Sequence, residues 1–348
     1  MNNKSISTRM KNTLNLTFFG LILCLLMACQ NENPPQKHIV FVTGDEEYRS
    51  EESMPMLARI LKREGFRVSI CYALDSAGFI DPNNIKHISG LEILDSADMM
   101  VLFTRFRALP ENERNHIIKF SESGKPMVGF RTATHAFKYK EDSTLFQYND
   151  DWPRKIFGQK WITHHGHFGD GHEFLTDVQI IPGKEDNVVL RGVKPFKAYS
   201  WLYHVHGGDH ELFGNCDTLL RGRALKSNHL NNLEKFQIEN PVAWTKTYNG
   251  EFERGLDSPL GVGGKSGDSP SGARGENGSR VFFSTVAHPF DFKDESCRKL
   301  ALNGIMWALG EEDRIPKDGM NADYVGEYEP NNSGFGKKYK LNRKPPEL

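Results

Sequence analysis

Cysteine is scarce in this chain of 348 residues, which contains only five. Beyond the N-terminal apolar segment, the body retains Cys71, Cys216 and Cys297. Three scattered cysteines do not make a disulfide framework, and none of them forms the C-x-x-C pair of a typical zinc site. A single disulfide bridge between two of them can still form if the chain enters an oxidising compartment.

An excess of either charge is also lacking, because 44 Lys+Arg residues stand against 45 Asp+Glu residues and leave a net charge of −1. The chain therefore has no general basic character with which to bind a phosphate backbone, and we expect no nucleic-acid partner. The length suits one large domain or two small ones, with ample chain to bury a core. It leaves the oligomeric state open.

Long apolar runs are missing except for one near the N-terminus, from Phe18 to Ala28. Lys4, Arg9 and Lys11 precede this run, which is short for a membrane span, and the order of charge and apolar residues predicts a targeting segment over residues 1–29. Three kinds of targeting segment fit this order of residues: a lipoprotein signal, a plain cleaved signal peptide and an uncleaved anchor. The polar residues 30–37, with two prolines, predict a tether between this segment and the folded body.

The end of this segment, Leu26-Met-Ala-Cys29, resembles a bacterial lipoprotein signal, in which the cysteine carries the lipid. The resemblance implies export, lipidation at Cys29 and a membrane anchor facing the periplasm. Gln30 follows the cysteine, and by the same resemblance it favours the outer membrane.

The body alternates apolar strand-like runs with amphipathic segments. Strands are predicted at residues 38–43, 67–72, 99–104 and 127–130, and a helix from Pro110 to Ser123 lies between the last two. A last strand from Arg280 leads into a helix that Asp294 caps and Gly310 ends. This order predicts an α/β fold with an open, doubly wound, mostly parallel sheet over residues 38–314. Residues 315–348 are polar and predict a tail that wraps the surface or is disordered.

Polar residues gather where the predicted strands end, and ligands of such sheets bind at that edge. The turn after residue 130 holds Arg131 where many α/β enzymes place a nucleophilic cysteine or serine. We expect proton transfer by a histidine near a carboxylate, with His288 as the first choice and a buried structural histidine as the alternative. The predicted catalytic residues are His288, Asp291, Asp45 and His135. The predicted substrate-binding residues are Glu46, Tyr48, Arg105, Arg131, Thr132, Trp201, Tyr203, His204 and His206.

Two further stretches are rich in aromatic residues and histidine. Residues 161–172 hold four histidines and an aspartate in a glycine-rich setting. The sequence establishes no cofactor. If a metal binds, we expect a divalent, zinc-like ion at His165 and His167. Residues 200–206 alternate as a strand does, and their rings suit either the face of a sugar or a packed core.

Residues 255–279 contain eight glycines and predict a flexible excursion. Gly264-Lys265-Ser266 is not a phosphate-binding loop, because Pro259 stands where that motif needs a glycine.

From about His38 to Asp313 the chain resembles the ThuA-like, or trehalose-utilisation, family. The resemblance rests on Gly44–Tyr48, Gly129–Ala133, Ser200–Tyr203, Pro241–Trp244 and Val281–Asp291. It implies a fold like that of class I glutamine amidotransferases, which is flavodoxin-like, and a link to disaccharides and their 3-keto forms. Those amidotransferases need a cysteine at the turn, so glutamine hydrolysis is excluded here.

Three hypotheses follow. The chain is an enzyme, a hydrolase or lyase, that acts on a disaccharide or keto-sugar glycoside; or it is a sugar-binding lipoprotein without catalysis; or it is an interaction subunit with a degenerate site. Titratable groups on several strand-end loops favour the first two.

Overall fold

A computed structural model describes residues 36–167, 172–250, 252 and 278–348. The predicted targeting segment, most of the tether and nearly all of the glycine-rich excursion lie outside these residues. Residues Lys37–Leu348 form one compact unit, so the polar tail from residue 315 packs with the body. No helix within the described residues is long and apolar enough to cross a membrane.

A nine-stranded sheet runs through this unit in the order β2-β1-β3-β4-β11-β10-β9-β6-β7. Its strands are β1 (His38–Gly44), β2 (Arg67–Cys71), β3 (Met99–Thr104), β4 (Met127–Phe130), β6 (Thr176–Ile180), β7 (Phe196–Ala198), β9 (Asn215–Ala224), β10 (Glu239–Tyr248) and β11 (Ser279–Ser284). The first five in this order pair in parallel, and the remaining pairs are antiparallel. A separate ribbon joins β5 (Thr163–His164) to β8 (Tyr203–His204).

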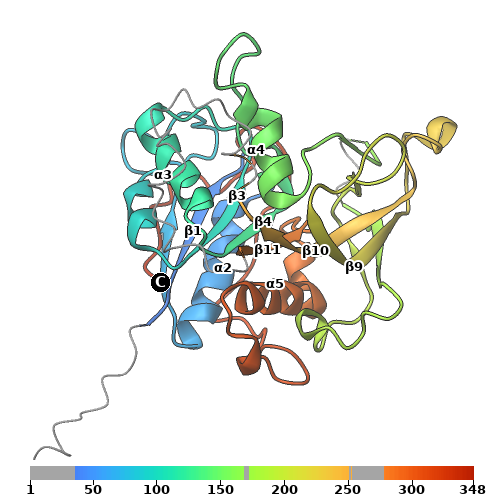
Figure 1. The fold of residues 1–348 in the computed structure, drawn as a ribbon. Coiled ribbons are helices and arrows are strands. Elements are labelled where there is room, and N and C mark those ends of the chain that lie inside the picture. The colour runs from blue at the N-terminus through green and yellow to red at the C-terminus, as the bar shows by residue number, and fades with distance from the viewer. Residues whose placement is uncertain (1–35, 168–171, 251, 253–277) are drawn as a thin grey trace, which may run out of the picture. The chain divides into compact units, whose positions relative to one another are not determined.

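Helices cover both faces of the sheet, as Figure 1 shows. Helices α2 (Ser50–Arg63) and α5 (Glu295–Ala308) pack on one face, and α3 (Glu111–Glu122) and α4 (Gln147–Phe157) pack on the other. Strand β1 explains the arrangement, because Ile39 and Phe41 enter one core while Val40 and Val42 enter the other. The predicted α/β, doubly wound and mostly parallel sheet is confirmed. The antiparallel extension was not predicted.

Short helical turns complete the fold at η1 (Leu91–Ser96), η2 (Arg131–His135), η3 (Val188–Leu190), η4 (Leu230–Asn232), η6 (Asp291–Lys293) and η7 (Glu312–Arg314). The Asp294 side chain accepts hydrogen bonds from the first N–H groups of α5, as the sequence predicts. Residues 200–206 are strand only at Tyr203 and His204, so the strand predicted there is shorter in the structure. Cys71, Cys216 and Cys297 form no disulfide with one another, so the single bridge left open by the sequence is absent among the described residues.

Candidate functional site

The carboxyl ends of β1, β3, β4 and β11 meet at one edge, because these strands are parallel neighbours. The loops that leave them begin at Gly44, Thr104, Phe130 and Ser284. Arg131 and His288 therefore lie at the same edge of the sheet. The ring of Tyr48 lies near both of them.

Arg131 occupies the strand-to-helix turn after β4 and has a left-handed backbone, with φ of 41°. A long side chain in this conformation is unusual and needs support from its surroundings. Its guanidinium supplies that support by donating to the carbonyls of Trp201 (3.1 Å) and Thr285 (2.8 Å) and to the Tyr48 hydroxyl (2.8 Å). Three segments of the chain are thereby joined at this turn.

The Arg131 guanidinium also lies between two aromatic rings, 4.1 Å from the centre of Tyr48 and 4.3 Å from that of Tyr203. The residue is completely buried. Cation–π contact is strong in such a desolvated place. Because most of the guanidinium donors bind within the protein, Arg131 provides a fixed positive charge under the site.

Asp45 ties the loop after β1 to the same turn. One carboxylate oxygen accepts from the backbone N–H groups of Glu47 and Tyr48, both at 2.8 Å, and the other accepts from the Thr132 hydroxyl. Asp45 is fully buried. The structure thus shows Asp45 and Thr132 holding the loop in place and shows no contact between Asp45 and His288.

Carboxylates and guanidinium groups alternate beside this turn. Glu46 pairs with Arg105 and Arg107, and Glu47 lies 3.0 Å from Arg105 Nε. Burial raises the pKa of Glu47 to about 7, although the Arg105 charge opposes the shift. Sequence reasoning missed Glu47 and Arg107. The only available signal was the adjacency of Glu47 to Glu46.

His288 is fully buried, and its two ring nitrogens have different partners. Nδ1 accepts from the Phe290 backbone N–H at 3.0 Å, so the neutral ring carries its proton on Nε2 and donates it to Ser333 Oγ at 2.9 Å. Burial, and then the Arg131 charge, hold the pKa of His288 well below its usual value. Because Nε2 carries the proton, His288 in this state cannot act as a base toward Ser333, which excludes a serine nucleophile activated by this pair.

Asp291 lies beside His288 but does not contact its ring. Its carboxylate accepts from the backbone N–H of His288 (2.9 Å) and of Tyr199 (2.6 Å), and from the Ser200 hydroxyl (2.5 Å). Burial raises the pKa of Asp291 to about 6. The arrangement fixes the backbone at His288.

Two more histidines face the charge of Arg131. His135 Nδ1 lies 3.0 Å from Thr134 Oγ1, and burial, followed by the charge of Arg105, lowers its pKa well below the usual value. His164 stacks on Trp201 with ring centres 5.3 Å apart, and burial, followed by Arg131, lowers its pKa to about 4. His164 was not predicted as a site residue.

The β5–β8 ribbon separates the remaining histidines from this group. His164 pairs with Tyr203 and Thr163 with His204, so adjacent residues point to opposite faces. His204 lies in a second cluster, with its Nε2 3.1 Å from His210 Nδ1, and His165 Nδ1 contacts Ser227 Oγ at 2.7 Å. The predicted substrate-binding residue His206 is exposed, as is the predicted metal ligand His167.

No group of three His, Cys, Asp or Glu side chains within the described residues is arranged to hold a metal ion. His165 does have a buried Nε2 with no hydrogen-bond partner in the described part of the chain, as a single ligand would. Residues 168–171 of the predicted metal loop lie outside the described residues. A metal at His165 and His167 stays a prediction.

The C-terminal tail closes the site from outside. Ser333 contacts His288, the Gly334 N–H donates to the Glu47 carbonyl at 2.8 Å, and the Arg105 guanidinium lies 5.0 Å from the Phe335 ring centre. A bond from Asn331 Nδ2 to the Lys338 carbonyl at 2.9 Å closes this loop on itself. We name residues 331–338 the closing loop.

An aromatic cavity of about 520 Å³ adjoins His288. The Tyr199 ring stacks on the His288 ring with centres 5.7 Å apart, and it also contacts Phe174 and Phe290. These three aromatic residues line the cavity with Lys197, Lys293 and Asp294. None of the six was predicted as a site residue.

Comparisons with known proteins give structural neighbours but no sequence match. No family model matches the chain, and no curated protein matches it. Among solved structures, a protein described as thua-like from Parabacteroides merdae is 16% identical, with a TM-score of 0.46, over 88% of this chain and 100% of its own.

Two further structures are more distant. The N-terminal domain of mmIFT52 is 9% identical, with a TM-score of 0.40, over 78% of this chain and 97% of its own. The exo-β-1,4-mannosidase Op5Man5 from the Opitutaceae bacterium strain TAV5 is 7% identical, with a TM-score of 0.34, over 79% of this chain and 36% of its own.

Proposed function

We propose that this chain is a ThuA-like, exported lipoprotein enzyme that acts on a carbohydrate, either a disaccharide or a keto-sugar glycoside, by proton transfer at the sheet edge. The observation that carries the proposal is the stack of Tyr199 on His288 at the wall of the aromatic cavity. Aromatic rings bind the apolar faces of sugar rings, and a polar group beside them can reach the hydroxyls.

Groups suited to acid–base work lie at the turn, and His288 among them contacts two wall residues of the cavity, Tyr199 and Phe290. The Glu47 carboxyl, with a pKa near 7, can either hold or release a proton at neutral pH, which is what a general acid or base needs. His288 presents an N–H at Nε2 that can donate to a substrate oxygen once Ser333 has moved away. Arg131 holds a positive charge nearby that stabilises a developing negative charge.

The test is turnover of a panel of disaccharides and their 3-keto forms by the purified protein, with and without a chelator. His288→Ala is expected to lower turnover by about 10²-fold or more, as for a lost general acid or base, while the folded structure remains. His116→Ala on α3 is the control, because His116 contacts only Asp95 at the surface. Unchanged turnover in a folded His288→Ala protein would remove His288 from the mechanism.

A second candidate function is sugar binding without catalysis, and the Ser333 contact favours it. In the present arrangement Ser333 of the closing loop accepts the hydrogen bond from His288 Nε2. A ligand would therefore rest on Tyr199 and Phe290 without reaching the Nε2 proton. Binding of a panel sugar with no turnover of any member, and loss of binding in Tyr199→Ala, would select this candidate.

The proposed export and anchoring rest on the N-terminal sequence alone. The segment ending Leu26-Met-Ala-Cys29 supports a lipid at Cys29 and a location facing the periplasm. We expect Cys29→Ala to move the protein from the membrane fraction to the soluble fraction. A wild-type protein that is already soluble and carries no lipid would contradict the assignment.

A further inference from the structure

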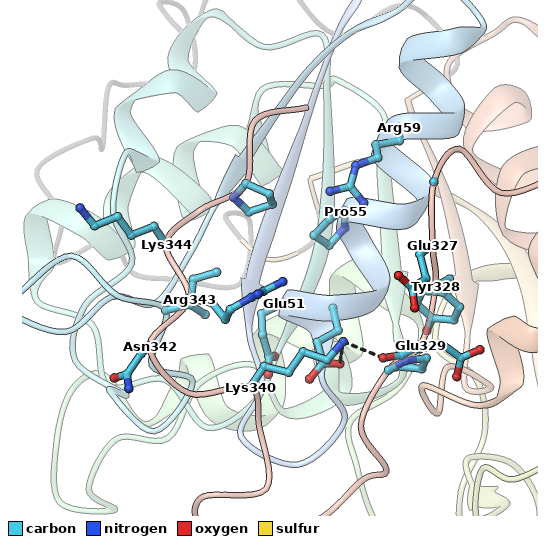
Figure 2. Close-up of a pocket in the computed structure, with 15 residues that line it drawn as sticks. Glu51, Pro55, Arg59, Glu327, Tyr328, Glu329, Lys340, Asn342, Arg343 and Lys344 are labelled. Carbon is cyan, nitrogen blue, oxygen red and sulfur yellow. Dashed lines mark hydrogen bonds and ion pairs between the residues drawn. The ribbon is translucent and has the colours of Figure 1, made fainter.

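A cavity of about 740 Å³ lies between helix α2 and the C-terminal tail, apart from the aromatic cavity. Figure 2 shows its walls: Glu51, Pro55 and Arg59 come from α2, and residues from Glu327 to Lys344 come from the tail. None of the predicted site residues lines it. Its chemistry is therefore independent of the proposed reaction.

Two guanidinium groups enter this cavity from opposite walls. Arg59 extends from α2 and Arg343 extends from the tail toward the space beside Pro55 and Glu51 (Figure 2). Neither side chain has a hydrogen bond, an ion pair or an aromatic contact with another of the described residues. An arginine fork without a partner is a ready donor set for a carboxylate or a phosphate.

Two carboxyl oxygens of the cavity wall also have no partner. Glu51 Oε2 and Glu52 Oε1 are buried and accept no hydrogen bond within the described part of the chain, and Glu51 as a whole is 8% exposed. Buried polar atoms nearly always have partners, so these two oxygens are open to a hydrogen bond from a water molecule or from an external group. Hydroxyl groups suit them, because a hydroxyl can donate to an ionised carboxyl and accept from a protonated one.

The other charges of the wall leave the cavity open to an anion. Lys340 lies 3.6 Å from Glu52 Oε2, and Lys293 binds Glu329 at 2.8 Å, so these two pairs largely balance. Burial raises the pKa of Glu51 to about 8, which keeps this carboxyl largely neutral at pH 7. Besides Arg59 and Arg343, the wall carries one further positive charge, Lys344, and one further negative charge, Glu327.

We propose that this cavity binds a small polyhydroxylated anion, with its phosphate or carboxylate group between Arg59 and Arg343 and its hydroxyl groups at Glu51 and Glu52. A sugar phosphate and a sugar acid share this chemistry. The volume exceeds what an inorganic anion fills and lies in the range of small-molecule sites. The tail that forms one wall continues into the closing loop. The backbone N–H of Asn331, the first residue of that loop, donates to Glu52 Oε2 at 2.8 Å.

The experiment is calorimetric titration of the whole chain with glucose 6-phosphate, gluconate, inorganic phosphate and glucose. We expect one of the two anionic sugars to bind more tightly than both inorganic phosphate and glucose. Tighter binding of glucose 6-phosphate would identify the bound group as a phosphate, and tighter binding of gluconate would identify it as a carboxylate. Combined replacement Arg59→Gln and Arg343→Gln should weaken that binding about tenfold or more, because charged hydrogen bonds are lost.

One further variant locates the binding. Arg67→Gln is the matched control, because Arg67 is an exposed arginine that does not line the cavity, and this variant should bind as the wild type does. The proposal is overturned if no anionic sugar binds, if the folded double variant binds as the wild type does, or if Arg67→Gln weakens binding as much as the double variant does.

Discussion

At the scale of single residues, burial shifts the pKa values of three groups of the site toward their uncharged forms. Burial raises the pKa of Glu47 to about 7 and that of Asp291 to about 6, and it lowers the pKa of His288. All three shifts favour the uncharged form, as desolvation does. Arg131 is a buried cation beside them, and two tyrosine rings and two carbonyls compensate for its lost hydration.

The Glu47 shift predicts how stability depends on pH. Its folded-state pKa of about 7 lies above the ordinary value of 4.5, so the folded protein holds this proton more tightly than the unfolded chain does. The contribution of this proton to the free energy of unfolding is fully present below about pH 4.5 and is lost as the pH rises through about 7. Glu47→Gln should therefore be more stable than the wild type at pH 8, by at most about 3 kcal/mol.

Urea unfolding of both proteins at pH 5 and pH 8 measures this difference. Glu141→Gln, which replaces an exposed glutamate, is the control and should follow the wild type at both pH values. Equal pH dependence in the Glu47→Gln protein and the wild type would contradict the buried, neutral Glu47.

The hydrogen bonds of His288 predict its tautomer. Phe290 N–H donates to Nδ1, so the proton belongs on Nε2, and the lowered pKa keeps the ring neutral below pH 6.5. Nitrogen-15 NMR of the imidazole should show the Nε2–H form at pH 8 and still at pH 6.5. An Nδ1–H signal, or protonation near pH 6.5, would contradict the structure.

The sequence predicted residues that directly follow apolar runs, and it missed those that tertiary packing brings in. Arg131 and His288 were predictable because their strands are continuous and apolar. Ser333 was not, because a polar tail has no periodicity to place it. His164 was passed over for its neighbour His165, since only the pairing of β5 with β8 determines which histidine faces the turn.

At the scale of elements, β4 illustrates how closely the sheet and its helices pack. Gly129 lies in the middle of β4, and a Cβ there would stand 2.6 Å from Phe283 and 2.7 Å from Phe157. Both neighbours are buried aromatic rings that cannot move freely. The strand can approach β11 and α4 this closely only because residue 129 has no side chain.

Gly129→Ala should lower the free energy of unfolding by about 1–3 kcal/mol, the usual range for overpacking a core. Gly65→Ala is the comparison, because a Cβ at Gly65 meets nothing within 4 Å and only the left-handed backbone opposes it. Chemical denaturation of the two variants should give the larger loss for Gly129→Ala. A Gly129→Ala protein as stable as the wild type would show that the two rings can separate.

Elements with a strong apolar period were predicted, and the weakly patterned ones were not. The buried strands β1, β3 and β4 and the helices α3 and α5 lie where the sequence placed them. Strands β6 and β9 were missed because polar residues outnumber apolar ones in them. Strand β7 has three residues at the edge of the sheet, and so short a strand forms only when a neighbour supplies its hydrogen bonds.

At the scale of the whole molecule, the end of the tail lies beside one edge of the sheet. Strand β2 is an edge strand, and Pro345, Pro346 and Leu348 line a cavity together with its residues. The Ile80 N–H also donates to the Arg343 carbonyl at 2.8 Å. Covered edges prevent pairing with other chains.

A chain that ends at Tyr339 should lose about 1–3 kcal/mol of stability and should self-associate as its concentration rises, because β2 is then uncovered. Denaturation and light scattering measure the two effects. Tyr339→Phe in the full-length chain is the control, since it removes only the hydroxyl group, which contacts Asp81 at 3.1 Å, and leaves the rest of the tail in place. A truncated chain that stays monomeric at all concentrations would contradict the protective role of the tail.

The closing loop has a consequence for access to the site. Ser333 follows His288 by 45 residues in the sequence, yet its hydroxyl contacts His288 Nε2 at 2.9 Å. The closing loop contains no helix or strand of the fold. Access to the imidazole proton therefore depends on a segment that belongs neither to the sheet nor to the helices that cover it.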